Sequence, residues 1–164
     1  MRSRYACAIA VLTLCAAVGV TGVAAQSATP RAVPGSGAPT TMTLVERALH
    51  VTTLDLGTPG PSLGDIIIWG PDPLYDAKNA TDTGATTQGN CVSFNAADDC
   101  LANETIVFPD GSTLEIAGIQ LGGTVASTRT IIGGSGRYRG ATGTVTVQPS
   151  ADRTTWTKTF AIWP

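Results

Sequence analysis

The stretch that decides the fold class is Thr154-Thr155-Trp156-Thr157-Lys158-Thr159-Phe160-Ala161-Ile162-Trp163. Every second side chain from Trp156 to Ile162 falls on one face, and all of these except Lys158 are aromatic or aliphatic. Threonines and Ala161 occupy most of the opposite face. Alternation with a period of two is typical of a β-strand that buries one face. The stretch therefore predicts a strand that faces a core.

Seven further segments show strand signals, and most of them end at glycine or proline, as in Pro109-Asp110-Gly111. No stretch after residue 25 sustains a helical stripe, so the pattern predicts an all-β sandwich or barrel. Eight antiparallel strands close naturally into a β-barrel wide enough for one small ligand, and closure removes exposed edges. The seven segments cover residues 43–56, 65–69, 84–94, 101–108, 112–119, 125–132 and 137–147.

Residues 1–25 have the pattern of a secretory signal peptide. Arg2 and Arg4 give a basic start, residues 5–23 form an apolar run, and small residues precede the expected cleavage after Ala25. The alternative is an uncleaved membrane anchor, because the run is nearly long enough to span a bilayer. We expect a secreted, extracellular protein that has no membrane contact after cleavage.

A linker follows the expected signal peptide. Residues 26–41 are rich in Ser, Thr, Pro, Gly and Ala, without an apolar period, which predicts a flexible segment. Residues 42–164 are then left for the β-barrel domain, a length that suits one domain. Without Arg2 and Arg4 the chain has 8 basic and 12 acidic residues, a formal net charge of −4. This balance argues against a nucleic-acid partner, which would require a basic patch.

Two of the four cysteines, Cys91 and Cys100, lie after the expected signal peptide. Two cysteines in a small exported domain usually pair, and closing a loop of this size stabilises by roughly 2–3 kcal/mol. The alternative is a metal pair, but His50 is the only histidine, so a closed zinc site lacks ligands. We expect a Cys91–Cys100 disulfide and no metal site.

Three segments carry a family signal. They are Ser62-Leu63-Gly64-Asp65 with Pro73-Leu74-Tyr75-Asp76, Phe108-Pro109-Asp110-Gly111-Ser112-Thr113-Leu114, and Ile131-Ile132-Gly133-Gly134-Ser135-Gly136-Arg137-Tyr138-Arg139-Gly140-Ala141-Thr142-Gly143. Together they resemble the allene oxide cyclase and dirigent protein superfamily. The resemblance implies an eight-stranded antiparallel barrel, often a homotrimer, with a mostly apolar lumen. It also implies a bacterial secreted member that guides cyclisation or coupling of a small molecule without a cofactor.

The resemblance assigns candidate catalytic residues. In allene oxide cyclases a carboxylate, an amide and a proline cluster near the end of the first strand. His50 stands at the carboxylate position, Thr52 at the amide position, and only Pro59 matches the family. If this face lines the lumen, His50 is a candidate proton donor or acceptor near neutral pH. The alternative is a partly exposed strand histidine.

Dirigent proteins hold aspartates in the lumen that act as acids, and the nearest equivalents here are Asp55 and Asp72. Both aspartates abut turn residues, so hydrogen bonding within a turn is the alternative. Tyr138 follows the glycine-rich turn and either lines the barrel mouth or plugs the barrel end.

The remaining candidates are ligand-binding residues on the expected lumen walls. Aromatic side chains stack on apolar ligands, but they also form cores and subunit interfaces, and both alternatives stay open. With the polar candidates, the ligand-binding set is Thr52, Pro59, Trp69, Tyr138, Trp156 and Phe160.

Two functions fit this sequence. The first is a secreted barrel that binds a small hydrophobic molecule and directs its cyclisation or stereochemistry, as a cofactor-free isomerase or cyclase. A dry lumen would act mainly by holding the substrate in a reactive conformer. The second is a structural or carrier barrel without enzymatic activity. The lumen discriminates between them, because a cavity lined by His50, Asp55 or Asp72 favours the first function, and a barrel filled by side chains favours the second.

Overall fold

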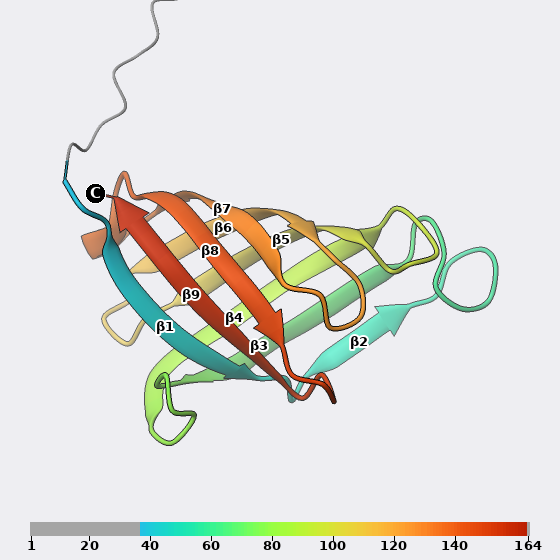
Figure 1. Cartoon of the computed structure of the whole chain (residues 1–164), viewed down its shortest axis with the longest axis horizontal. Helices are drawn as coiled ribbons and strands as arrows, with labels where there is room; N and C mark the ends of the chain where they lie inside the picture. The colour runs from blue at the N-terminus through green and yellow to red at the C-terminus, as the bar shows by residue number, and fades with distance from the viewer. Residues whose placement is uncertain (1–36, 164) are drawn as a thin grey trace, which may run out of the picture. The chain divides into compact units, whose positions relative to one another are not determined.

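A computed structural model describes residues 37–163, which form nine strands and one short 3-10 turn (Figure 1). No α-helix occurs in this described part of the chain, as the alternating sequence pattern predicts. The elements are β1 (Thr40–Arg47), β2 (Val51–Leu54), β3 (Ile66–Tyr75), β4 (Asp82–Ser93), β5 (Cys100–Val107), β6 (Thr113–Gln120), β7 (Ser127–Gly134), the turn η1 (Gly136–Tyr138), β8 (Thr142–Pro149) and β9 (Thr155–Trp163).

The strands form one closed antiparallel sheet, which confirms the predicted eight-stranded barrel. The order is β1-β9-β8-β7-β6-β5-β4-β3-β2, and β1 also pairs with β3 to close the barrel. Both β1 and β2 lie along β3, with Val45 opposite Tyr75 and Val51 opposite Trp69. The two short strands therefore occupy one of the eight barrel positions. Figure 1 shows β2 continuing from the end of β1.

Three predicted strands differ by more than two residues from their expected bounds. The strand predicted over residues 137–147 begins with η1, and β8 starts only at Thr142 and continues to Pro149. The predicted strand over residues 43–56 is interrupted between Arg47 and Val51, and β1 starts at Thr40, two residues before the expected start at Met42. The predicted strand over residues 65–69 does not end at Gly70-Pro71, because β3 continues to Tyr75.

A β-bulge explains how β3 passes through Gly70-Pro71. The register with β4 shifts between Trp69 and Asp72, so the residues in between need no ladder partner. Gly70 has a φ of +85°, and a Cβ there would lie 2.3 Å from the Thr87 carbonyl oxygen. Only glycine fits this close approach of two strands.

Hydrophobic side chains fill one end of the barrel. Phe160, Leu114 and Ile106 are fully buried there. Phe108 stacks on Tyr138 with ring centroids 4.8 Å apart and closes this end, at the hairpin loops β5–β6 and β7–β8. Tyr138 therefore plugs the barrel end, which is the second of its two sequence interpretations.

The expected signal peptide and residues 26–36 of the expected linker lie outside the described residues, and Thr40 and Thr41 of that linker belong to β1. Between residues 37 and 163, no helix is long and apolar enough to cross a membrane.

Candidate functional site

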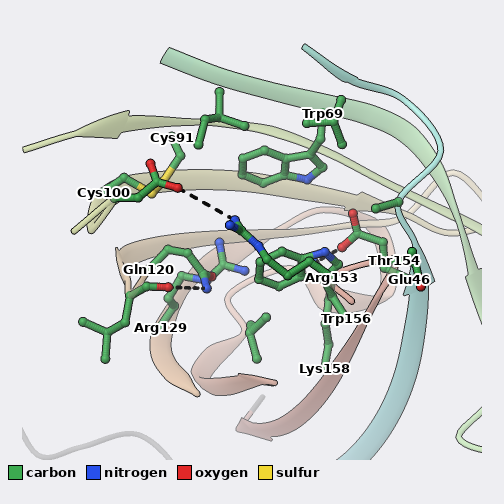
Figure 2. A pocket seen from close by; sticks show the side chains of 16 residues that line it. Glu46, Trp69, Cys91, Cys100, Gln120, Arg129, Arg153, Thr154, Trp156 and Lys158 are labelled. Atoms are coloured by element: carbon green, nitrogen blue, oxygen red, sulfur yellow. Dashed lines mark hydrogen bonds and ion pairs between the residues drawn. A yellow bond between two sulfur atoms is a disulfide. The ribbon is translucent and has the colours of Figure 1, made fainter. Parts of the chain in front are cut away.

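A cavity of about 330 Å³ opens at the barrel end opposite to the Phe108–Tyr138 pair (Figure 2). Loop residues from the β4–β5, β6–β7 and β8–β9 hairpins frame it, among them Asp98 and Arg153. The Arg153 guanidinium lies 3.9 Å from the Asp98 carboxylate and bridges two of these loops. The volume of the cavity lies at the small end of the range for ligand cavities.

Two tryptophans form part of the cavity wall. Trp69 comes from β3 and Trp156 from β9, and Ile67 and Val51 add aliphatic surface. Trp69 lies directly over Gly89 of β4, because a Cβ at Gly89 would sit 2.5 Å from the indole Cζ2. The glycine therefore makes the space that the indole occupies. The Trp69 Nε1 is buried and has no hydrogen-bond partner among the described residues.

Charged side chains form the floor of the cavity. The Lys158 ammonium lies 2.7 Å from Glu46 and also donates to Glu104. The Arg129 guanidinium donates to the other Glu104 oxygen, and Thr87 donates to Glu104 as well. Each of these residues is at most 4% exposed. Because a lone buried charge is costly, the four charged groups depend on one another.

Gly118 allows Arg129 to reach Glu104. Arg129 lies on β7 and Glu104 on β5, with β6 between them. A Cβ at Gly118 of β6 would lie 3.3 Å from the Arg129 Cα, Cβ and Cγ atoms, so the missing side chain leaves room for the arginine to cross. One Arg129 nitrogen reaches Glu104, whereas Nε and Nη1 have no partner within residues 37–163.

The pKa values of the two buried carboxyl groups, Glu46 and Glu104, shift in opposite directions. Burial raises the pKa of Glu46, and the nearby Lys158 only partly offsets this effect. Burial acts on Glu104 too, but Lys158, Arg129 and the hydrogen bonds that they and Thr87 donate outweigh it and lower the pKa to about 2. Glu104 is therefore a fixed anion, and Glu46 is the group suited to exchange a proton with a bound molecule.

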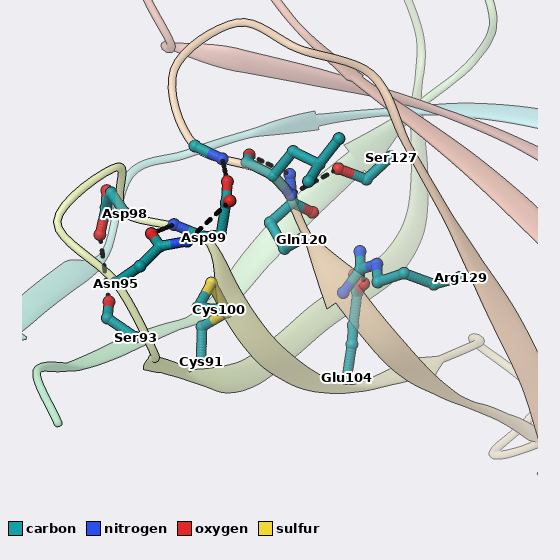
Figure 3. Close-up of a disulfide and its surroundings, with 12 residues drawn as sticks. Cys91, Ser93, Asn95, Asp98, Asp99, Cys100, Glu104, Gln120, Ser127 and Arg129 are labelled. Carbon is teal, nitrogen blue, oxygen red and sulfur yellow. Dashed lines mark hydrogen bonds and ion pairs between the residues drawn. A yellow bond between two sulfur atoms is a disulfide. The ribbon is translucent and has the colours of Figure 1, made fainter. Parts of the chain in front are cut away.

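A disulfide lies in the cavity wall, as predicted. Cys91 of β4 and Cys100 of β5 are bonded, with their Cα atoms 5.5 Å apart (Figure 3). Both cysteines line the cavity and pack with Ala102, Ile67 and Trp69. The disulfide therefore holds the base of the β4–β5 loop, which carries Asp98.

The three candidate catalytic residues lie outside the cavity lining. His50 has a side chain 63% exposed, and its Nδ1 lies 2.9 Å from Asp72 Oδ1. Asp72 is fully buried, accepts from the backbone N–H groups of Leu49 and His50, and bridges the break between β1 and β2. Asp55 is exposed and accepts from the Gly60 N–H, which is the turn hydrogen bonding of its alternative interpretation.

Two of the six candidate ligand-binding residues, Trp69 and Trp156, line the cavity. Phe160 is fully buried in the hydrophobic core, as is most of Tyr138 at the plugged end. Thr52 and Pro59 are exposed and do not line the cavity.

Glu46, Glu104, Arg129 and Lys158 were not among the residues singled out from the sequence. A signal for them exists, because each charge alternates in phase with apolar or small inward residues: Lys158 stands between Trp156 and Phe160. In the described part of the chain, no group of three or more His, Cys, Asp and Glu side chains is placed to hold a metal ion.

Several solved structures share this fold. A pyocyanin demethylase is 24% identical, with a TM-score of 0.67 over 76% of this chain and 100% of that chain. The pterocarpan synthase dirigent protein GePTS1 is 17% identical, with a TM-score of 0.58 over 78% of this chain and 86% of that chain. The Diels-Alderase AbmU from Streptomyces koyangensis is 19% identical, with a TM-score of 0.56 over 77% of this chain and 69% of that chain. At these identities the likeness concerns the fold alone.

A search of curated proteins finds no match to the sequence. The dirigent-like protein family matches residues 33–162, which include β1–β8 and all of β9 except Trp163. With its closed antiparallel barrel and apolar-walled cavity, the chain belongs to the dirigent-like protein family.

Proposed function

We propose that the protein binds a small hydrophobic molecule in the barrel cavity and directs its cyclisation or stereochemistry. The observation that carries this proposal is the cavity itself, with two tryptophans in its walls and a buried acid–base group in its floor. A barrel that served only as a structural module would be filled by side chains at both ends, as it is at the Phe108–Tyr138 end.

The cavity walls suit a planar or conjugated molecule. Trp69 and Trp156 offer aromatic faces, and the disulfide, Ile67 and Val51 add further apolar surface. Aromatic faces stack on flat ligands, and the enclosed walls exclude water. A molecule that is held in one conformer reacts along one path, which is how shape alone directs a cyclisation.

Glu46 is the proposed proton-transfer group. It lines the cavity, burial raises its pKa, and Lys158 lies 2.7 Å from its carboxylate. A carboxyl group with a raised pKa donates a proton to a reacting ligand more readily near neutral pH. Lys158 then stabilises the carboxylate that remains, while Glu104 keeps Lys158 and Arg129 in place.

The structural neighbours support a cyclisation chemistry. They include a pterocarpan synthase dirigent protein and a Diels-Alderase. Both names describe enzymes or guides of ring formation on this fold. The proposed reaction needs no cofactor, because shape and one proton-transfer group are sufficient.

We also propose that the protein is exported and forms a homotrimer. The basic start and apolar run of residues 1–25, together with the disulfide, support export. On the outer face, Val92, Leu101 and Ile119 are paired across β4, β5 and β6 and are 42%, 49% and 51% exposed. Such an exposed apolar row supports contact between copies, which sedimentation equilibrium measures directly.

The test of the proposed function is a search for molecules that copurify with the protein. The wild type, Ala48→Trp and Leu49→Trp are extracted and compared by untargeted mass spectrometry. Ala48 lines the cavity, so the new indole fills it, whereas Leu49 is 65% exposed and lies outside the lining. We expect a molecule that the wild type and Leu49→Trp retain and Ala48→Trp loses.

Turnover separates a catalyst from a carrier. With the copurified molecule or its precursor in hand, Glu46→Gln should slow product formation at least tenfold and leave binding within about twofold, because it removes only the proton. Binding without any conversion by the wild type would favour the carrier function. Equal retention of small molecules by all three proteins would refute a ligand cavity.

A further inference from the structure

Two side chains that line the cavity carry buried hydrogen-bond donors that have no partner in the described part of the chain. The Arg129 side chain is 2% exposed, and its Nε and Nη1 have no partner in the described chain. The Trp69 Nε1 is likewise buried without a partner within residues 37–163. Both side chains line the cavity, and Figure 2 shows the Arg129 guanidinium at its floor.

Unpaired buried donors are costly and therefore mark a place where something binds. Burying a donor without an acceptor costs more free energy than an ordinary hydrogen bond contributes, and native proteins leave few such groups. Guanidinium and indole N–H groups donate and never accept. The complementary group is therefore an acceptor oxygen, and a guanidinium binds an anionic oxygen most strongly.

Other charged side chains line the cavity near the unpaired donors, and each has a partner. The cavity lining contains three basic side chains, Arg129, Arg153 and Lys158, against two acidic ones, Glu46 and Asp98. Asp98 is engaged by Arg153, and Glu46 by Lys158. Glu104 pairs with Lys158 and with one nitrogen of Arg129, so it is the unpaired nitrogens of Arg129, and not an excess of positive charge, that favour an anion.

We propose that the cavity selects hydrophobic ligands that carry an anionic oxygen, as a carboxylate, phenolate or enolate does, and that Arg129 binds this oxygen. The inference rests on the proposed function, since it assumes that the cavity is a ligand site. Trp69 offers a second donor for a carbonyl or hydroxyl oxygen of the same molecule. The apolar body of the ligand then stacks between Trp69 and Trp156, and its charged end lies at the floor beside Glu46.

The test uses three probes with one ring system and different end groups. They are naphthalene-2-carboxylate, the uncharged 2-methylnaphthalene and the cationic 2-aminomethylnaphthalene, titrated into the purified protein by calorimetry at pH 7. We expect the carboxylate to bind at least tenfold more tightly than the uncharged probe, because a hydrogen bond to a charged group has about this effect. The cation should bind more weakly than the uncharged probe.

The variant Arg129→Lys keeps a cation beside Glu104 but removes the two unpaired donors. It should weaken binding of the carboxylate about tenfold or more and change binding of 2-methylnaphthalene by less than twofold. Arg137→Lys is the matched control, because Arg137 lies at the plugged end beside Phe108 and should change neither affinity. Circular dichroism shows whether each variant is folded, and the wild-type probe series alone is decisive if Arg129→Lys does not fold.

The outcomes separate this inference from the proposed function. If 2-methylnaphthalene binds and the carboxylate binds no better, the anion preference is wrong and the hydrophobic cavity stands. If none of the three probes binds, both proposals are overturned. A carboxylate preference that Arg129→Lys leaves unchanged would also overturn the assignment to Arg129.

Discussion

Replacing Lys158 with methionine should destabilise the folded protein by about 3–5 kcal/mol at pH 7. Lys158 is 1% exposed, lies 2.7 Å from Glu46 and donates to Glu104. Methionine keeps most of the side-chain volume but leaves two buried carboxylates without their shared cation, and breaking a buried ion pair in this way has a cost of that size. Since small proteins are stable by only about 5–15 kcal/mol, the melting temperature should fall by roughly 10 °C or more.

The loss should depend on pH in a defined direction. In the wild type, burial would raise the pKa of Glu104, but Lys158 and Arg129 outweigh burial and lower it from 4.5 to about 2. A lowered folded-state pKa contributes stability above pH 4.5, here about 3 kcal/mol, and this stability is lost as pH falls toward 2. Without Lys158 the Glu104 carboxyl takes up a proton at a higher pH. The difference between the wild type and Lys158→Met should therefore narrow between pH 7 and pH 3.

The assay is urea unfolding followed by circular dichroism at pH 7 and pH 3. The control is Lys78→Met, which alters the only other lysine, an exposed one, and should shift the unfolding free energy by less than about 0.5 kcal/mol. A loss below about 1 kcal/mol for Lys158→Met at pH 7, or an equal loss at both pH values, would refute the buried-network reasoning.

Three further predictions concern the same end of the barrel. Burial raises the pKa of Glu46, so the wild-type unfolding free energy should decline as pH rises above 4.5, and urea titrations of Glu46→Gln should lack this decline. Replacing Cys91 and Cys100 together by serine should cost about 2–3 kcal/mol in unfolding free energy, and alkylation with mass spectrometry should find no free thiol in the exported wild type. Asp98→Ala should speed the exchange of a fluorescent cavity ligand in stopped-flow experiments. It should lower the free energy of unfolding by under about 1 kcal/mol, because the contact of Asp98 with Arg153 is partly exposed. An unchanged exchange rate would show that the contact does not gate the cavity.

The fold could be predicted because the inward face of each strand is marked by apolar or small residues at every second position. Trp156, Phe160 and Ile162 alternate with outward residues in β9, and this pattern survives in the structure. The break between β1 and β2 could not be predicted, because it depends on Asp72 of the neighbouring strand β3. The Asp72 carboxylate accepts hydrogen bonds from the backbone N–H groups of Leu49 and His50. That contact joins residues more than twenty positions apart, and no local pattern encodes it.

The candidate site was only partly accessible from the sequence. Trp69 and Trp156 were identified because large aromatic residues on a strand suggest a wall. The charged floor was missed, since it arises where the register of several strands brings Arg129, Glu104 and Lys158 together. A lysine within an apolar alternation is the signal that a buried partner must exist, but the sequence alone does not identify that partner.

The barrel is plugged at one end by Phe108 and Tyr138, and in the described part of the chain its cavity opens toward the loops that carry Asp98 and Arg153. A ligand held in the cavity would bind and dissociate past these same loops. Starting material and finished product would exclude each other, and inhibition by product would be strictly competitive. Under the proposed function, turnover would be fastest where a later step removes the product, and it would slow where the product accumulates.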